Sequence, residues 1–315
     1  MMKKVAVLGA GTMGKGIANN FAVAGYEVHL FDSFESARKS AIPTIRQDMS
    51  LMAEMGVFHE EKVEEAIKNI IIYDDMAAAS KDADFLMEVV PEVLTLKQDI
   101  FKELDGCCKP ECIFASNTSS LKLEDIMAKV SPERKKRTMI CHFYNPAHLL
   151  PIVELSFYGN MPEDIFEGVF RMFYDIGKQP VKVKKDVPGL VANRIQNAMA
   201  REIYSMIENE VADPEEIDKA IKFGPCFRYA TTGQMEITDL GGLDIWTTVA
   251  DTIWPDLEDR KDAPDILRRK VNEGKLGVKS GEGFQKYDTP QKKEKIVRNF
   301  HKRLMIQLIA SENYK

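Results

Sequence analysis

A glycine-rich turn near the start of the chain constrains the fold more than any other segment. Residues 5–8 are continuously apolar and predict a buried strand, and Gly9, Gly11 and Gly14 follow with the spacing Gly-x-Gly-x-x-Gly. Gly9 permits a tight turn, Gly11 lets the backbone approach a pyrophosphate, and Gly14 lets the next helix pack closely on the sheet. That helix is expected to begin at Thr12, where free N–H groups and the helix dipole attract phosphate. The segment therefore predicts a dinucleotide-binding turn.

An acidic residue supports this interpretation and selects the cofactor. Asp32 ends the next apolar segment, residues 27–32, and lies 18 residues after Gly14. A carboxylate in this place accepts hydrogen bonds from the adenosine ribose hydroxyls and repels a 2′-phosphate. The sequence therefore predicts NAD as the cofactor, rather than NADP.

The rest of the first half alternates short apolar runs with helical segments. Continuous apolar strands separated by helices are typical of a parallel sheet that is covered on both faces. The expected strands are 70–73, 85–90, 112–115, 138–142, 152–157 and 181–184, and the expected helices are 12–24, 35–55 and 60–68. The fold class is therefore predicted as α/β, with a Rossmann-type, doubly wound and mainly parallel sheet in an NAD-binding domain over residues 1–186.

The second half changes character where Pro188 and Gly189 interrupt the pattern. Apolar residues then recur at helical spacing, and no further strands are expected. The expected helices are 190–211, 214–222, 234–253, 263–273 and 291–310. We therefore expect an all-helical domain over residues 187–315 that contributes to substrate binding and closes a homodimer.

Composition excludes several classes of function. The net charge of −6 argues against nucleic acid as a partner, and no apolar run approaches the length of a membrane span. The five cysteines have neither the spacing of a disulfide framework nor that of a zinc site. The sequence therefore predicts a cytoplasmic protein with a small-molecule substrate, no metal site and no membrane or nucleic-acid partner.

A histidine and a carboxylate supply acid–base chemistry. His142 ends the expected strand 138–142, and the polar run 116–120 follows the strand before it. Ligands of such sheets bind at the carboxyl ends of the strands, so both segments are expected at the edge that holds the glycine turn. An imidazole accepts a proton near neutral pH, and Glu154 on the next strand is placed to orient it.

Five sequence blocks in order resemble the L-3-hydroxyacyl-CoA dehydrogenase family, which includes 3-hydroxybutyryl-CoA dehydrogenases. They are VAVLGAGTMG at 5–14, FASNTSSL at 114–121, HFYNP at 142–146, KDVPGLVANR at 185–194 and KSGEGFQKY at 279–287. The resemblance covers nearly the whole chain. It implies a Rossmann-type domain, a helical dimerisation domain and an NAD-dependent oxidoreductase acting on CH–OH.

The resemblance also implies roles for individual residues. His142 matches the catalytic base and Glu154 the acid that orients it, while Ser119 and Asn193 match residues that hold the substrate oxygens. The positions that match cofactor-binding residues are Gly9, Gly11, Thr12, Met13, Gly14, Asp32, Glu92, Lys97, Asn117, Asn145 and Lys279.

The substrate is less sharply defined than the reaction. The blocks around Ser119 and His142 favour a short-chain (S)-3-hydroxyacyl-CoA, as in fatty acid and butyrate metabolism. In fatty-acid-type members, however, the helix after Asp32 is lysine-rich and meets the CoA phosphates, whereas residues 45–55 here contain one arginine, two acids and three methionines. The alternative is a free hydroxy acid or small alcohol, as in gulonate (lambda-crystallin), carnitine or pyridine-alcohol dehydrogenases. A non-catalytic NAD-binding protein and a 6-phosphogluconate-type dehydrogenase are two further alternatives.

Overall fold

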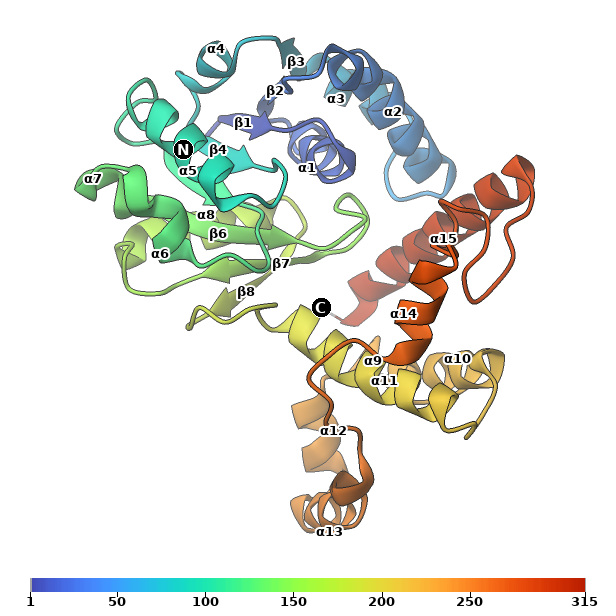
Figure 1. The fold of residues 1–315 in the computed structure, drawn as a ribbon. Coiled ribbons are helices and arrows are strands. Elements are labelled where there is room, and N and C mark those ends of the chain that lie inside the picture. The colour runs from blue at the N-terminus through green and yellow to red at the C-terminus, as the bar shows by residue number, and fades with distance from the viewer. Residues whose placement is uncertain (1, 315) are drawn as a thin grey trace. The chain divides into compact units, whose positions relative to one another are not determined.

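The structure, a computed structural model, describes residues 2–314 and divides into two compact units (Figure 1). Unit 1 comprises residues up to 193 together with 304–309, and unit 2 comprises 194–303 with the residues after 309. The chain therefore leaves unit 1 after Asn193, a little beyond the expected domain limit at 186. It returns to unit 1 for one short segment near its end.

Unit 1 is built on one sheet of eight strands in the order β3-β2-β1-β4-β5-β6-β7-β8. Strands β1 to β6 are parallel, β7 is antiparallel to β6, and β8 is parallel to β7. The doubly wound, mainly parallel sheet predicted from the sequence is confirmed. The strands are β1 (Lys4–Leu8), β2 (Glu27–Phe31), β3 (Ile70–Tyr73), β4 (Phe85–Glu88), β5 (Ile113–Ser116), β6 (Thr138–Phe143), β7 (Ile152–Ser156) and β8 (Gln179–Val183).

Helices cover both faces of this sheet. On β1, Val5 and Val7 pack into one apolar cluster, while Ala6 and Leu8 pack into another on the opposite face. This burial of alternate residues on both sides explains why the strands are apolar throughout. The helices of unit 1 are α1 (Thr12–Val23), α2 (Glu35–Glu54), α3 (Glu61–Lys68), α4 (Met76–Ser80), α5 (Leu94–Asp105), α6 (Leu123–Ile126), η1 (Met127–Lys129), α7 (Pro132–Lys135) and α8 (Glu163–Asp175).

Unit 2 consists of helices, as expected. The one helix expected over 234–253 is two helices, because Gly242 adopts a φ of +89° between them, which ends the first. No helix of residues 2–314 is both long enough and apolar enough to cross a bilayer. The remaining helices are α9 (Ala192–Glu208), α10 (Pro214–Phe223), α11 (Pro225–Tyr229), α12 (Gln234–Gly241), α13 (Leu243–Ile253), η2 (Trp254–Asp256), α14 (Asp265–Asn272), α15 (Pro290–Ser311) and η3 (Glu312–Tyr314).

The segment of α15 that returns to unit 1 is held by apolar packing. Met305 is fully buried in a cluster with Leu51 and Met52 of α2 and with Leu149, which lies between β6 and β7. The methionines of α2 therefore form core contacts within unit 1.

Candidate active site

The three glycines of the turn have different surroundings: two are tightly packed, and one is open. A Cβ atom on Gly14 would lie 1.7 Å from the carbonyl oxygen of Gly9, and one on Gly9 would lie 2.7 Å from that of Val89. A Cβ atom on Gly11 would meet nothing within 4 Å, and Gly11 is the N-cap of α1, with no side-chain cap in the described chain. Gly9 and Gly14 are thus required by packing, whereas Gly11, together with Thr12 and Met13 of the first helical turn, fits a pyrophosphate group.

Asp32 joins the end of β2 to this turn. Its Oδ2 atom accepts a hydrogen bond of 2.7 Å from the amide of Ala10, and its Oδ1 atom accepts one of 2.8 Å from the amide of Phe34. Each carboxylate oxygen can accept a second hydrogen bond, so the side chain can also receive ribose hydroxyls. The placement of Asp32 beside the glycine turn fits the adenosine half of NAD.

Lys97, a predicted cofactor contact, is enclosed in an ion-pair network. Its amine donates to both carboxylate oxygens of Glu88 at 2.8 and 2.9 Å and lies 3.2 Å from Glu92. The side chains of Lys97 and Glu88 are fully buried, whereas that of Glu92 is 40% exposed. Glu92 is therefore the member of this network that presents a polar group at the surface, and Lys97 holds it in place.

The turn that carries Ser119 is fixed from two sides. The hydroxyls of Thr118 and Ser120 both donate to Glu92, and the amide of Gly189 donates to the carbonyl oxygen of Ser119 at 2.8 Å. Burial alone would raise the pKa of Glu92, but these hydroxyl hydrogen bonds and the nearby Lys97 charge hold it below the ordinary value. The ionised carboxylate of Glu92 therefore stabilises the serine turn.

The other predicted cofactor residues have different surroundings. The side-chain oxygen of Asn117 accepts a hydrogen bond of 2.9 Å from the amide of Phe143, so it ties the end of β5 to β6 beside His142. Asn145 is exposed in the loop that follows β6, and Lys279 is exposed in a turn of unit 2. Their contacts with a cofactor remain predictions.

His142 and Glu154 are directly opposite each other on β6 and β7. The Nδ1 atom of His142 lies 2.8 Å from Glu154 Oε2, and Glu154 Oε1 accepts hydrogen bonds from the amides of Val191 and Ala192 at 2.8 and 2.9 Å. Burial alone would raise the pKa of Glu154, but the hydrogen bonds from His142 and the two amides hold it below the ordinary value. An ionised Glu154 places the proton on Nδ1 and leaves Nε2 as the proton acceptor.

Asn193 is joined to the same group by a residue that the sequence did not single out. The hydroxyl of Tyr144 donates to Asn193 Oδ1 at 2.6 Å, and the Tyr144 ring packs edge-on against the His142 ring at 5.4 Å between centroids. The structure thus brings Asn193, Tyr144, His142 and Glu154 together. The position of Tyr144, two residues after His142 on the same strand end, was the available signal.

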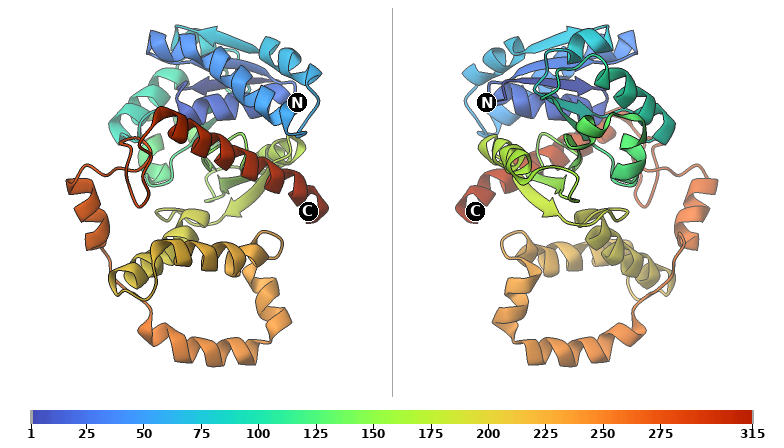
Figure 2. Two further views of the ribbon diagram at one scale, coloured as in Figure 1. Left: turned by 90° about the vertical axis from the view of Figure 1, so that its right-hand side faces the viewer. Right: turned by 90° about the vertical axis from the view of Figure 1, so that its left-hand side faces the viewer.

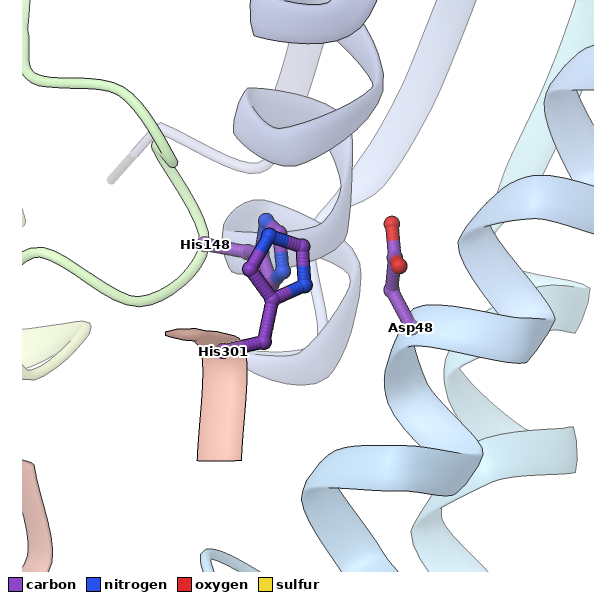
Figure 3. Close-up of side chains that lie close together, drawn as sticks. All are labelled: Asp48, His148 and His301. Atoms are coloured by element: carbon purple, nitrogen blue, oxygen red, sulfur yellow. The ribbon is translucent and has the colours of Figure 1, made fainter. Parts of the chain in front are cut away.

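A carboxylate and an imidazole meet elsewhere in unit 1. Asp48 on α2 and His148, between β6 and β7, lie with potential ligand atoms within 4.8 Å of each other (Figure 3). Burial raises the pKa of Asp48 to about 6, although the charge of Lys15 acts in the opposite direction. His301, drawn in the same figure, belongs to unit 2. Within unit 1 this pair supplies fewer ligands than the roughly three or four protein ligands of a typical zinc site.

Comparison with known proteins agrees with this geometry. Residues 4–187 match the model of the 3-hydroxyacyl-CoA dehydrogenase NAD binding domain, and residues 189–287 match that of the 3-hydroxyacyl-CoA dehydrogenase C-terminal domain. The chain is 35% identical to a 3-hydroxybutyryl-CoA dehydrogenase of Bradyrhizobium diazoefficiens, with 91% of this chain and 96% of the relative covered. It is 32% identical to the 5-formyl-3-hydroxy-2-methylpyridine 4-carboxylate 5-dehydrogenase of Mesorhizobium japonicum, with 93% of each covered.

Similar solved structures also include both a pyridine-carboxylate dehydrogenase and a 3-hydroxybutyryl-CoA dehydrogenase. A crystal structure of a 5-formyl-3-hydroxy-2-methylpyridine 4-carboxylic acid 5-dehydrogenase, described as an NAD⁺-dependent dismutase, matches with a TM-score of 0.91 at 30% identity over 100% of both chains. That of (S)-3-hydroxybutyryl-CoA dehydrogenase from Ralstonia eutropha matches with a TM-score of 0.73 at 31% identity, over 92% of this chain and 100% of the other. With both family models matched along most of its length, the chain belongs to the 3-hydroxyacyl-CoA dehydrogenase family of NAD-dependent oxidoreductases.

Proposed function

We propose that this enzyme oxidises a small hydroxy-carboxylate, or reduces the matching carbonyl compound, and that its substrate carries no nucleotide handle. The observation that supports this choice is the charge of α2, the helix that meets the CoA phosphates in the fatty-acid-type members. This helix contains three basic and three acidic residues, and its net charge is therefore zero. A CoA head group with its 3′-phosphate favours a site with several uncompensated cations.

The basic residues of α2 also have local partners. Lys39 pairs with Glu35 at 2.7 Å, and Arg46 pairs with Glu64 of α3 at 2.8 Å. Arg38 donates to the carbonyl oxygen of Asp32 at 2.6 Å. Binding a phosphate would require these contacts to break or be shared, which reduces the net gain. The rest of the site is compatible with both kinds of substrate found among the relatives, small molecules and CoA thioesters.

In the proposed mechanism, His142 Nε2 removes the proton of the substrate hydroxyl. Glu154 keeps the imidazole in the required tautomer and stabilises the imidazolium that forms. Ser119 and Asn193 hold the oxygens of the substrate. Bound NAD, held by the glycine turn and Asp32, supplies the hydride acceptor. Reduction of the carbonyl form uses the same groups in reverse, with the imidazolium returning its proton.

A 3-hydroxyacyl-CoA is the second candidate, as first expected from the sequence. The Ser119 and His142 motifs favour it, and a relative named as a 3-hydroxybutyryl-CoA dehydrogenase is 35% identical to this chain. The test compares acetoacetyl-CoA, a pantetheine thioester without the nucleotide, and free hydroxy acids such as gulonate and carnitine, each with NAD(H). Turnover of a free acid with little on acetoacetyl-CoA supports the proposal. Efficient turnover of acetoacetyl-CoA that weakens with salt and exceeds that of the pantetheine thioester contradicts it.

We further propose that unit 2 closes a homodimer. Figures 1 and 2 show α12 and α13 as an arm that stands away from α9. Large apolar side chains on this arm are exposed, among them Leu240 at 78%, Leu243 at 63% and Ile245 at 58%. An apolar surface of this kind favours burial against a second copy. Light scattering after size-exclusion chromatography is expected to give a dimer, and Leu243→Glu is expected to give monomers; a parent that is monomeric at micromolar concentration contradicts this proposal. The cytoplasmic location stays a prediction.

A further inference from the structure

Tyr144 contacts both Asn193 and His142, two residues that take part in the proposed mechanism. Its hydroxyl donates to Asn193 Oδ1 at 2.6 Å, and its ring edge packs against His142. Neither contact is needed to build the sheet, because β6 ends at Phe143. The side chain therefore links the first turn of α9 to the base through contacts made within unit 1.

The hydrogen bond determines how Asn193 presents its amide. A side-chain amide offers a carbonyl acceptor on one atom and two N–H donors on the other, and it can rotate to exchange them. A tyrosine hydroxyl that donates to Oδ1 favours the rotamer in which this oxygen faces Tyr144. The Nδ2 group of Asn193, which carries the two N–H donors, then faces away from the Tyr144 hydroxyl.

The hydroxyl of Tyr144 remains a donor over the whole working range of pH. Burial, with a further contribution from the negative charge of Glu154, raises the pKa of Tyr144 to about 12. Tyr144 is therefore neutral near pH 7, and its proton stays available to Asn193.

We propose that Tyr144 is a positioning residue that makes Asn193 a hydrogen-bond donor to the substrate, and thereby selects substrates with an acceptor oxygen next to the reacting alcohol. Carboxylates and carbonyl groups have such an oxygen, whereas an ammonium group in that place has only donors. This inference rests on the proposed function, because it assumes that Asn193 holds a substrate oxygen. It adds the polarity of that contact and the residue that sets it.

The experiment measures binding and turnover in a double-mutant cycle of Tyr144→Phe and Asn193→Ala. Isothermal titration of acetoacetate, and separately of acetoacetyl-CoA, into the enzyme–NAD⁺ complex reports affinity without turnover; reduction by NADH then reports kcat and KM. Tyr144→Phe is expected to weaken binding roughly 5–10-fold, the usual effect of one hydrogen bond, for whichever of these two ligands the parent enzyme binds. In the Asn193→Ala background the same change is expected to have less than about a twofold effect, because the Oδ1 atom that accepts from the Tyr144 hydroxyl is gone.

Asn193→Asp tests the polarity of the contact. Aspartate keeps an acceptor for the Tyr144 hydroxyl but has no donor for a substrate oxygen, so it is expected to bind acetoacetate more weakly than Asn193→Ala does. Tyr174→Phe, on the exposed face of α8, is the matched control and is expected to behave as the parent. Melting temperature and NAD affinity are measured for every variant, so that a folding defect is recognised.

Several outcomes would overturn the inference. They are parent-like binding by Tyr144→Phe, equal losses from Tyr144→Phe with and without Asn193, and parent-like binding by Asn193→Asp. The proposed function fails separately, if acetoacetyl-CoA is the better substrate or if His142→Gln retains turnover. The Tyr144–Asn193 coupling is then measured with acetoacetyl-CoA, whose carbonyl groups present the same acceptor chemistry. If neither ligand binds, the inference is overturned, whereas the proposed function is decided by the panel of free hydroxy acids.

Discussion

Replacing Glu154 by glutamine tests the proposed base in a way that follows directly from the geometry. The carboxylate receives three donors: Nδ1 of His142 on Oε2, and the amides of Val191 and Ala192 on Oε1. Glutamine has one oxygen and one NH₂ group in the same shape. The two backbone amides require an oxygen, so we expect the glutamine Oε1 to face them and its Nε2 to face His142.

This arrangement favours the other tautomer of the His142 imidazole. A donor facing Nδ1 requires Nδ1 to accept, which moves the ring proton to Nε2, the atom that has to take the substrate proton. The lost charge-assisted hydrogen bond is worth about 1.5–3 kcal/mol, or roughly a 10- to 150-fold change in rate. The inverted tautomer adds to this loss, as in serine hydrolases whose triad aspartate is replaced by asparagine. We expect kcat of Glu154→Gln to fall roughly 10²–10⁴-fold.

Steady-state kinetics from about pH 5 to 10 provide the measurement. Loss of the carboxylate charge removes a group that stabilises imidazolium, so the kinetic pKa of the base should fall, while the affinity for NAD should stay unchanged. Because its folded-state pKa is lowered, Glu154 stabilises the parent fully above its ordinary pKa of 4.5, and this contribution is lost in more acidic solution. Glu167→Gln makes the same change on the exposed surface of α8 and should be silent. A kcat within threefold of the parent, or an unchanged or raised kinetic pKa, would refute the proposed pairing.

His142→Gln should lower turnover roughly 10²–10⁴-fold with NAD binding retained, and activity within threefold of the parent would remove His142 from the mechanism. Asp32→Ser should weaken NAD and strengthen NADP in fluorescence titrations; a parent that uses NADPH as well as NADH contradicts this assignment. Gly11→Ala should melt like the parent but bind NAD at least about tenfold more weakly, whereas Gly14→Ala should not fold, since its Cβ would lie 1.7 Å from a carbonyl oxygen; unchanged NAD affinity in Gly11→Ala would place the pyrophosphate elsewhere. Burial raises the pKa of Asp48 from its ordinary value of 3.8 to about 6 in the folded state. The fold is therefore destabilised by the Asp48 charge increasingly as the pH rises through the range between these two pKa values. Asp48→Asn should therefore raise the melting temperature at pH 8 by roughly 2–4 °C and leave it nearly unchanged near pH 4, and an equal shift at both pH values would contradict this explanation.

Local patterns were sufficient for the strands of unit 1 and for α1 to α3, whereas α4 to α8 were not predicted individually. Strand β1 is apolar at every position because alternate side chains pack on opposite faces, and the glycine turn that follows it combines a strand end with a helix start. Both signals lie within a few consecutive residues. The longer helices of unit 2 were also recognisable from their periodicity, whereas the short helix α11 was not predicted. The break at Gly242, where a single glycine with positive φ ends one helix, was not predicted either.

The candidate site depended on contacts between distant segments. His142 and Glu154 could be proposed from their strands, but only the antiparallel register of β6 and β7 makes them direct partners. The burial of Lys97 against Glu88, and the hydrogen bond from Tyr144 to Asn193, left no periodic signal in the chain. The same holds for Met305, which packs in unit 1 although most of α15 belongs to unit 2.

The sequence by itself therefore predicted the fold class and the cofactor and led us to propose His142 as the general base, because spacing along the chain encodes secondary structure and the chemistry of individual side chains. Only the tertiary structure decided which polar groups share their protons, since a hydrogen bond between Tyr144 and Asn193 requires two segments to be placed to within a few tenths of an ångström.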